Sequence, residues 1–149
     1  MADIAALAAE LTNDPLVIGY AGMLDQQVLD SLSAMARPGV FETSDAREYL
    51  LLQGRWPAIE DAVLHHADAP VRQAAWSIKI VLDRYDTINM ADPMRVAAIS
   101  GTLDALVAAG LIVAADKTAL LALGNDKQSR TAELGLGRLT VGDIMAARA

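Results

Sequence analysis

Helix start and stop signals recur at short intervals along the whole chain, and they limit it to short helices. Glycines such as Gly54, Gly110 and Gly124 close apolar segments, and Pro or a small polar residue opens the next one. Oxygens of Asp, Asn, Ser and Thr cap the free N–H groups at a helix start, and glycine adopts the left-handed conformation at a helix end. The pattern predicts an all-α fold, with one compact domain over residues 1–149 made of seven to eight short helices.

The spacing of the apolar residues places these helices. The predicted helices span 2–12, 25–35, from Thr43 or Ser44 to Gly54, 56–66, 69–86, 93–109 and 114–123, with a single turn near 129–134 and a last helix from Thr140. Residues 16–23 are apolar but contain two glycines, so we expect an ordered buried loop there, and residues 40–42 are expected to be extended. The residues expected to face the core include Leu32, Met35, Gln53, Leu64, Ile78, Tyr85 and Leu103.

The composition favours helices that pack through Ala and Leu. Apolar residues make up 54% of the chain but aromatic residues only 4%. A sheet would draw more heavily on aromatic and β-branched residues. The apolar fraction is higher than a lone small domain needs, and it therefore predicts that part of the surface faces other chains. We expect an oligomer or a component of an assembly.

The charge pattern argues against a nucleic-acid partner, and the lengths of the apolar stretches argue against a membrane span. Twelve basic against nineteen acidic residues give a net charge of −7, and the basic residues are scattered, whereas nucleic-acid binding needs clustered positive charge. There is no cysteine, which excludes disulfides and zinc–thiolate sites and suits a reducing cytoplasm. The first residues lack the basic region of a signal peptide. The longest apolar stretch, 103–115, is interrupted by Asp104 and too short to span a bilayer.

No group of residues predicts catalysis, a cofactor or a metal ion. His65 and His66 are adjacent, so on a helix they point about 100° apart and do not share a ligand position as an i,i+4 pair would. Asp61 is placed to meet His65, but no further ligand lies nearby in sequence. The glycines of 135–137 lack the Lys-Ser or Lys-Thr of a phosphate loop, and the carboxylates are explained by helix capping and by solubility. We therefore expect neither an enzyme nor a protein that binds a small-molecule substrate.

Apolar residues near both ends of the chain are the main candidates for contacts with other subunits. One group lies in the Gly-containing stretch 16–23, and another brackets the glycines at 135 and 137, where we expect an exposed apolar ridge. Trp56 is added because Trp is common among binding hot spots. Burial in the subunit's own core is the alternative for each. The interface candidates are Leu16, Ile18, Tyr20, Met23, Trp56, Leu134, Leu136 and Leu139.

The two ends of the chain resemble small proteins of tailed bacteriophages. The opening motif is Asn13-Asp14-Pro15-Leu16, then Gly19-Tyr20-Ala21-Gly22-Met23 and Asp25, after a short Ala-rich helix. The closing motif runs from Ser129 through Gly135-Leu136-Gly137 to Thr140-Val141-Gly142-Asp143-Ile144 and Ala147-Arg148-Ala149. The middle of the chain is similar only in its pattern of short Ala-rich helices. Leu24 departs from the pattern, because a capping Ser or Thr is expected before Asp25.

The resemblance implies a virion protein without catalytic residues. Such a protein would assemble in the particle through contacts with other virion proteins and with copies of itself. The tail or adhesion apparatus is the location that the resemblance favours. A subunit of a head–tail connector ring is the alternative inside the particle. A cytoplasmic helical adaptor or chaperone-like regulatory protein, outside the particle, is the alternative of another class. Helix 2–12 and segment 129–149 are the parts that would dock on neighbours.

Overall fold

The structure, a computed structural model, describes residues 2–149 and is built almost entirely of helices. The only strands in this range are two of three residues each, so the all-α prediction is confirmed. The helices are α1 (Ile4–Asn13), α2 (Asp25–Ser33), α3 (Thr43–Leu52), α4 (Trp56–His65), α5 (Ala69–Arg84), α6 (Pro93–Ala108), α7 (Ala114–Ala122), α8 (Arg130–Glu133) and α9 (Val141–Arg148). The remaining elements are a 3-10 turn, Tyr20–Gly22, and strands β1 (Val40–Glu42) and β2 (Thr87–Asn89).

Contacts divide the chain into two compact units, whereas the sequence predicted one domain. Unit 1 combines both ends, Met1–Arg37 and Asp126–Ala149, and unit 2 is the intervening segment, Pro38–Asn125. Each unit has its own cluster of buried apolar side chains, and no residue belongs to both clusters. Helical periodicity shows which face of a helix is apolar, but it does not show which other helices that face meets. The division was therefore not visible in the sequence pattern.

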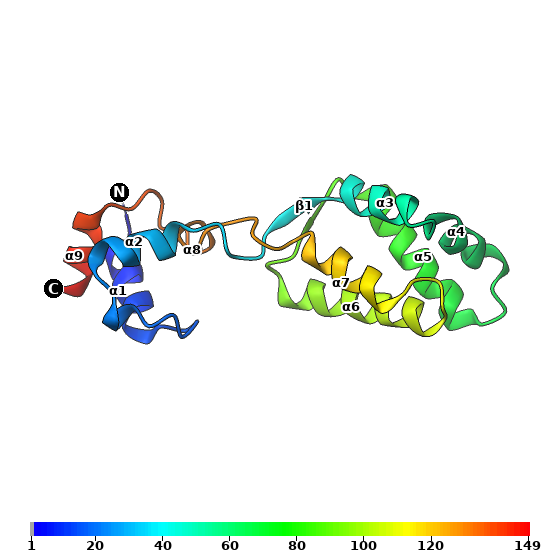
Figure 1. The fold of residues 1–149 in the computed structure, drawn as a ribbon, viewed down its shortest axis with the longest axis horizontal. Coiled ribbons are helices and arrows are strands. Elements are labelled where there is room, and N and C mark those ends of the chain that lie inside the picture. The colour runs from blue at the N-terminus through cyan, green and yellow to red at the C-terminus, as the bar shows by residue number, and fades with distance from the viewer. Residues whose placement is uncertain (1) are drawn as a thin grey trace. The chain divides into compact units, whose positions relative to one another are not determined.

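Unit 2 packs α3, α6 and the α4–α5 hairpin around a shared apolar core. Helix α5 contacts α3, α4 and α6, and α7 covers α3 and α6, an arrangement that can be followed from the cyan to the orange part of Figure 1. Strands β1 and β2 pair antiparallel, with Phe41 opposite Ile88. The large buried residues of unit 2 include Leu50, Ile59, Ile78, Leu82, Leu103, Leu106 and Ile112.

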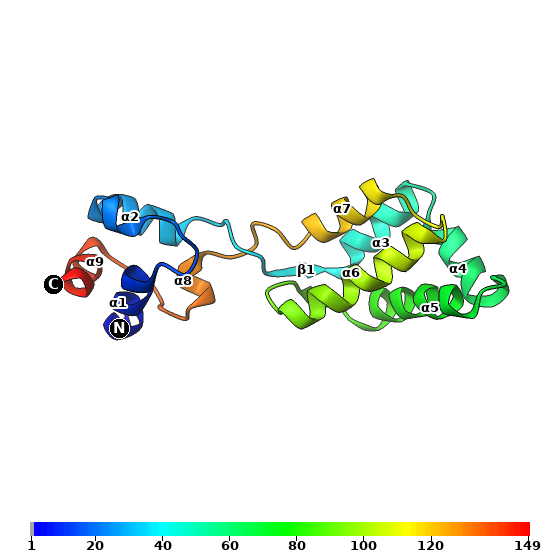
Figure 2. The ribbon, with the colours of Figure 1, turned by 90° about the horizontal axis from the view of Figure 1, so that it is seen from below.

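Unit 1 is formed by helices from opposite ends of the chain. Helix α9 packs against both α1 and α2, and α8 packs against α2. Figures 1 and 2 show the blue N-terminal helices beside the red C-terminal one. The buried residues of this core are Leu7, Tyr20, Val28, Leu32, Leu136, Leu139 and Ile144. Both ends of the sequence contribute side chains to this core.

The predicted start and stop signals act largely as expected. Thr140 and Asp143 form the predicted capping box, with the Asp143 carboxylate accepting from the Thr140 N–H at 2.8 Å. Gly110 follows α6 in the left-handed conformation, with φ of 75°. Gly124 has a different role, because a Cβ there would lie 2.4 Å from Cγ of Met90. Glycine at 124 therefore permits a close approach of two segments.

Four residues predicted to face the core are exposed instead: Met35, Gln53, Leu64 and Tyr85. Each lies in the last turn of its helix or just beyond it, where the chain turns away and the helical period no longer holds. The extended segment predicted at 40–42 is β1, but its partner β2 was not predicted, because three residues are too few to show an alternating pattern. No helix within residues 2–149 is long and apolar enough to cross a membrane.

Truncating the core of unit 2 should destabilise the protein much more than truncating an exposed leucine. Leu103 is buried, so we expect Leu103→Ala to lower the free energy of unfolding by about 2–5 kcal/mol. Leu52 is 78% exposed, and Leu52→Ala should change it by no more than about 0.5 kcal/mol. Urea denaturation followed by circular dichroism measures both. Equal effects of the two variants would contradict the placement of the core.

Candidate functional site

The apolar loop near the N-terminus is held by one carboxylate. The side chain of Asp14 accepts hydrogen bonds from the N–H groups of Ile18 at 2.7 Å and Gly19 at 2.6 Å. These bonds direct Tyr20 into the core of unit 1, where it is 1% exposed. The interface candidates Ile18 and Met23 pack against the same core, and Leu16 is half-buried. The loop is thus ordered, but the prediction that it is buried is wrong for most of it, because only Tyr20 is buried and Val17 is 88% exposed. Three of its four interface candidates nevertheless contribute to the core.

The C-terminal candidates also belong to the core of unit 1. Gly135 and Gly137 are left-handed, and the Leu136 N–H donates to the Thr131 carbonyl at 3.0 Å. This turn points Leu136 inward. The expected exposed ridge is wrong for Leu136 and Leu139, which are buried, and Leu134 is half-buried against the same cluster. An apolar residue beside a glycine turn fits either an interface or a core, and here the turn directs it to the core.

The two tryptophans of unit 2 have different environments. Trp56, the interface candidate, is buried at the start of α4. The ammonium of Lys79 lies 5.6 Å from the centre of its ring, within the range of a cation–π contact. Trp76, on α5, is 53% exposed. Within the subunit, therefore, Trp56 acts as a core residue, and Trp76 is the tryptophan available to other molecules.

A buried ion pair joins the two ends of the chain in unit 1. The Arg130 guanidinium donates to both carboxylate oxygens of Glu10, at 2.9 and 2.7 Å, and it also contacts Glu133 at 2.7 Å. The side chains of Glu10 and Arg130 are only 4% and 12% exposed. Arg37 extends the network through Glu133 at 2.8 Å. Sequence reasoning missed this network, because Glu10 and Arg130 are far apart in the chain and each looks like an ordinary surface residue.

The surroundings of this network perturb the groups that it contains. Burial, together with the negative charge of Glu10, raises the pKa of Tyr20 to about 12. The hydrogen bond from Arg37 lowers the pKa of Glu133, although partial burial acts in the opposite direction. Arg148 adds a second link between the ends, donating to the Met23 carbonyl at 2.9 Å and to Asp25 at 2.7 Å. These groups hold α1, α2, α8 and α9 together.

Asp116 organises a corresponding polar cluster in unit 2. Its carboxylate accepts from the Tyr49 hydroxyl at 3.0 Å, from Arg55 Nε at 2.9 Å and from the Val113 N–H at 2.9 Å. Burial alone would raise the pKa of Asp116, but these three donors outweigh burial, and the pKa is lowered. The cluster ties α7 to α3 and to the start of α4. Both oxygens of the Asp116 carboxylate are used in holding these helices.

Within the part of the chain that the structure describes, no group of side chains is arranged as a metal centre. His65 meets Asp61 at 2.9 Å, as its spacing predicted, but both side chains are largely exposed. Within residues 2–149, no cluster of three or more His, Asp or Glu side chains could hold a metal ion. The buried carboxylates of Glu10 and Asp116 are both paired with arginine. The arrangement of polar groups is therefore one that joins helices.

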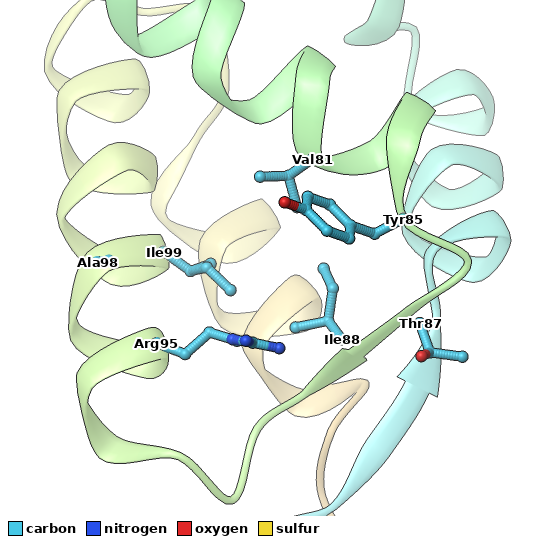
Figure 3. Close-up of a pocket in the computed structure, with 7 residues that line it drawn as sticks. All are labelled: Val81, Tyr85, Thr87, Ile88, Arg95, Ala98 and Ile99. Carbon is cyan, nitrogen blue, oxygen red and sulfur yellow. The ribbon is translucent and has the colours of Figure 1, made fainter.

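Unit 2 contains a pocket between α5, β2 and the start of α6. It has a volume of about 260 Å³, and its walls are mostly apolar. Figure 3 shows Val81 entering from α5, Tyr85 from just after its end, Ile88 from β2, and Arg95 and Ile99 from α6. The sequence did not predict this pocket, because three elements form it and Tyr85 was expected inside the core. Its mixture of aliphatic walls with an exposed phenol and a guanidinium suits binding.

Asp116 should make the protein less stable in acid. Because the pKa of Asp116 is lower in the folded than in the unfolded chain, its contribution is present above the unfolded value and lost as pH falls through the folded one. The free energy of unfolding should therefore drop below about pH 4. The Asp116→Asn protein should be less stable than the original protein at pH 7. Its free energy of unfolding should also fall less steeply between pH 7 and pH 3. Urea denaturation at pH 7 and pH 3 measures this, and parallel losses in both proteins would contradict it.

Comparisons with known proteins give no relative for this chain. No family model matches it, and neither a curated protein nor a solved structure shows significant similarity to it. The functional argument therefore rests on the residues and on the geometry described above.

Proposed function

We propose that this chain is a non-catalytic structural protein of a tailed-phage virion. It assembles through protein–protein contacts, and we place it in the tail or the adhesion apparatus in preference to other parts of the particle. In this role the polar clusters of both units keep helices in place, and exposed side chains make contacts with neighbouring subunits. The protein needs no cofactor, metal ion or substrate for this function.

The observation that carries the proposal is that both motifs resembling phage proteins lie in the same unit. The opening motif, around Asp14 to Asp25, and the closing motif, around Ser129 to Arg148, are far apart in sequence but share one core. Arg148 of the closing motif donates directly to Met23 and Asp25 of the opening motif. A resemblance confined to two distant segments is expected when those segments form one structural piece. The pairing of the motifs thus supports a shared origin for unit 1.

The exposed apolar residues of both units support an assembly role. Val17 is 88% exposed on the loop fixed by Asp14, and its φ of 54° is unusual for a β-branched residue. Unit 2 exposes Leu52, Leu64, Trp76 and Met94. Strained backbone persists where the surroundings hold it, frequently at sites of function. A rigid loop that keeps a valine in solvent is suited to contact with another subunit.

Mass spectrometry of purified particles tests the proposal. The phage that encodes this chain is grown, and its particles are purified and compared with infected-cell cytoplasm, with the phage's own replication proteins as the control for contamination. We expect the chain in the particles at a fixed ratio to the major capsid protein. Three or six copies would fit the distal tail, and twelve would fit a connector ring. Its presence in the cytoplasm but not in the particles would contradict the proposal and favour an adaptor.

A further inference from the structure

The pocket of unit 2 carries a cationic group that nothing in the fold uses. Most arginines of the chain are engaged, as Arg37, Arg55, Arg130 and Arg148 are in ion pairs. Arg95 instead has no ion pair or hydrogen bond within residues 2–149, although it lines the pocket. Figure 3 shows its side chain extending from α6 toward Ile88. Arg95 is exposed, and a guanidinium beside an apolar cavity is suited to a carboxylate that approaches from outside.

The residues around the opening are those that protein interfaces favour. Tyr85 is 60% exposed, and Arg95 is exposed as well. Tyr and Arg are both enriched at interfaces relative to the rest of the protein surface. Below them, Val81, Ile88 and Ile99 provide aliphatic walls. An apolar pocket with such a rim resembles the hot-spot pockets into which a partner's anchoring side chain inserts.

The size and charge of the pocket select the kind of occupant. At about 260 Å³ it lies near the lower end of the range of about 300–1,000 Å³ typical of sites for small molecules. A single guanidinium is far from the clustered positive charge that nucleic acid requires. A peptide that carries an apolar side chain next to a carboxylate complements both the apolar walls and the guanidinium. The apolar side chain covers the walls and excludes water from them, and the carboxylate pairs with Arg95.

We propose that this pocket docks a segment of another protein, which inserts one apolar side chain beside Ile88 and Ile99 and places a neighbouring carboxylate on Arg95. This rests on the proposed assembly function and names one surface that performs it. A second copy of this chain is the alternative occupant, and the titration below distinguishes it from another protein.

A peptide titration of the full-length protein tests the pocket without the particle. The probes are acetyl-Ala-Leu-Glu-Ala-amide and the same peptide with Gln in place of Glu, followed by NMR of the methyl groups of Val81, Ile88 and Ile99. We expect the Glu peptide to shift these methyl signals, and the Gln peptide to bind about ten-fold more weakly, because it cannot form the charged pair. The absence of methyl shifts at millimolar peptide would overturn the proposal.

Three variants separate the pocket from general surface effects. Arg95→Gln should reduce binding of the Glu peptide about ten-fold and leave the Gln peptide unchanged. Ala98→Leu, at an exposed lining position of α6, should block both peptides without loss of thermal stability. Arg84→Gln is the matched control, because Arg84 is exposed and unpaired in the described chain but does not line the pocket. An equal loss in Arg84→Gln would overturn the proposal.

The remaining outcomes distinguish this proposal from the proposed function. Methyl shifts of Ile88 and Ile99 that grow with protein concentration in the absence of peptide would show that a second copy fills the pocket, which overturns the docking of another protein. If the peptide binds as expected but the chain is absent from particles, the proposed virion function is wrong and the proposed docking pocket is still supported. If the chain is in particles, Ala98→Leu and Arg95→Gln should reduce its incorporation and Arg84→Gln should not. Full incorporation of all three variants would overturn the proposal.

Discussion

The ion pair between Glu10 and Arg130 is the interaction on which the arrangement of this chain depends. It joins an N-terminal helix to a C-terminal one through two hydrogen bonds, at 2.7 and 2.9 Å, in surroundings that leave the two side chains only 4% and 12% exposed. A buried pair of this kind adds little net stability compared with apolar packing, but loss of one partner leaves a charge uncompensated and is costly. The pair therefore specifies which segments meet. It makes unit 1 a product of both ends of the chain.

This arrangement gives the chain two cores with different origins. Unit 2 is one continuous segment whose helices are mostly neighbours in sequence, whereas unit 1 forms only when residues from both ends come together. Bringing distant segments together has an entropic cost that their contacts must offset. In unit 1 the polar contacts of Arg130 and Arg148 and the burial of Tyr20 and Leu136 provide that compensation. The proposed docking pocket lies wholly in unit 2, so it does not require unit 1 for its shape.

The sequence predicted local structure well, because the signals for helix ends are themselves local. The capping box at Thr140 and the glycine stop at Gly110 act within a few residues of the helix that they terminate. Long-range features were not predictable in this way. Glu10 and Arg130 carry no mark of their pairing, and β2 is recognisable only beside β1.

The predictions of functional residues were limited in the same way, because they too relied on local sequence patterns. Tyr20, Leu136 and Leu139 were predicted to contact other subunits because they are apolar residues next to glycine turns. Such a pattern does not show which surface they meet, and in the structure they meet the core of their own unit. Tyr85 was expected to be buried and instead lines the pocket, because α5 ends at Arg84 and the chain turns away there. The pocket itself exists only once three elements have packed together.

Hydrogen exchange of the full-length protein, read by mass spectrometry, tests most directly whether the two ends form one cooperative unit. In Glu10→Gln, exchange in α1, α8 and α9 should accelerate together, by about ten-fold or more, because removal of one partner weakens a buried pair. Exchange in α3 to α7 should stay unchanged. Asp30→Asn is the matched control, since it removes the same charge from an exposed position of unit 1. Faster exchange in α1 without α8 and α9, or across the whole chain, would contradict the account.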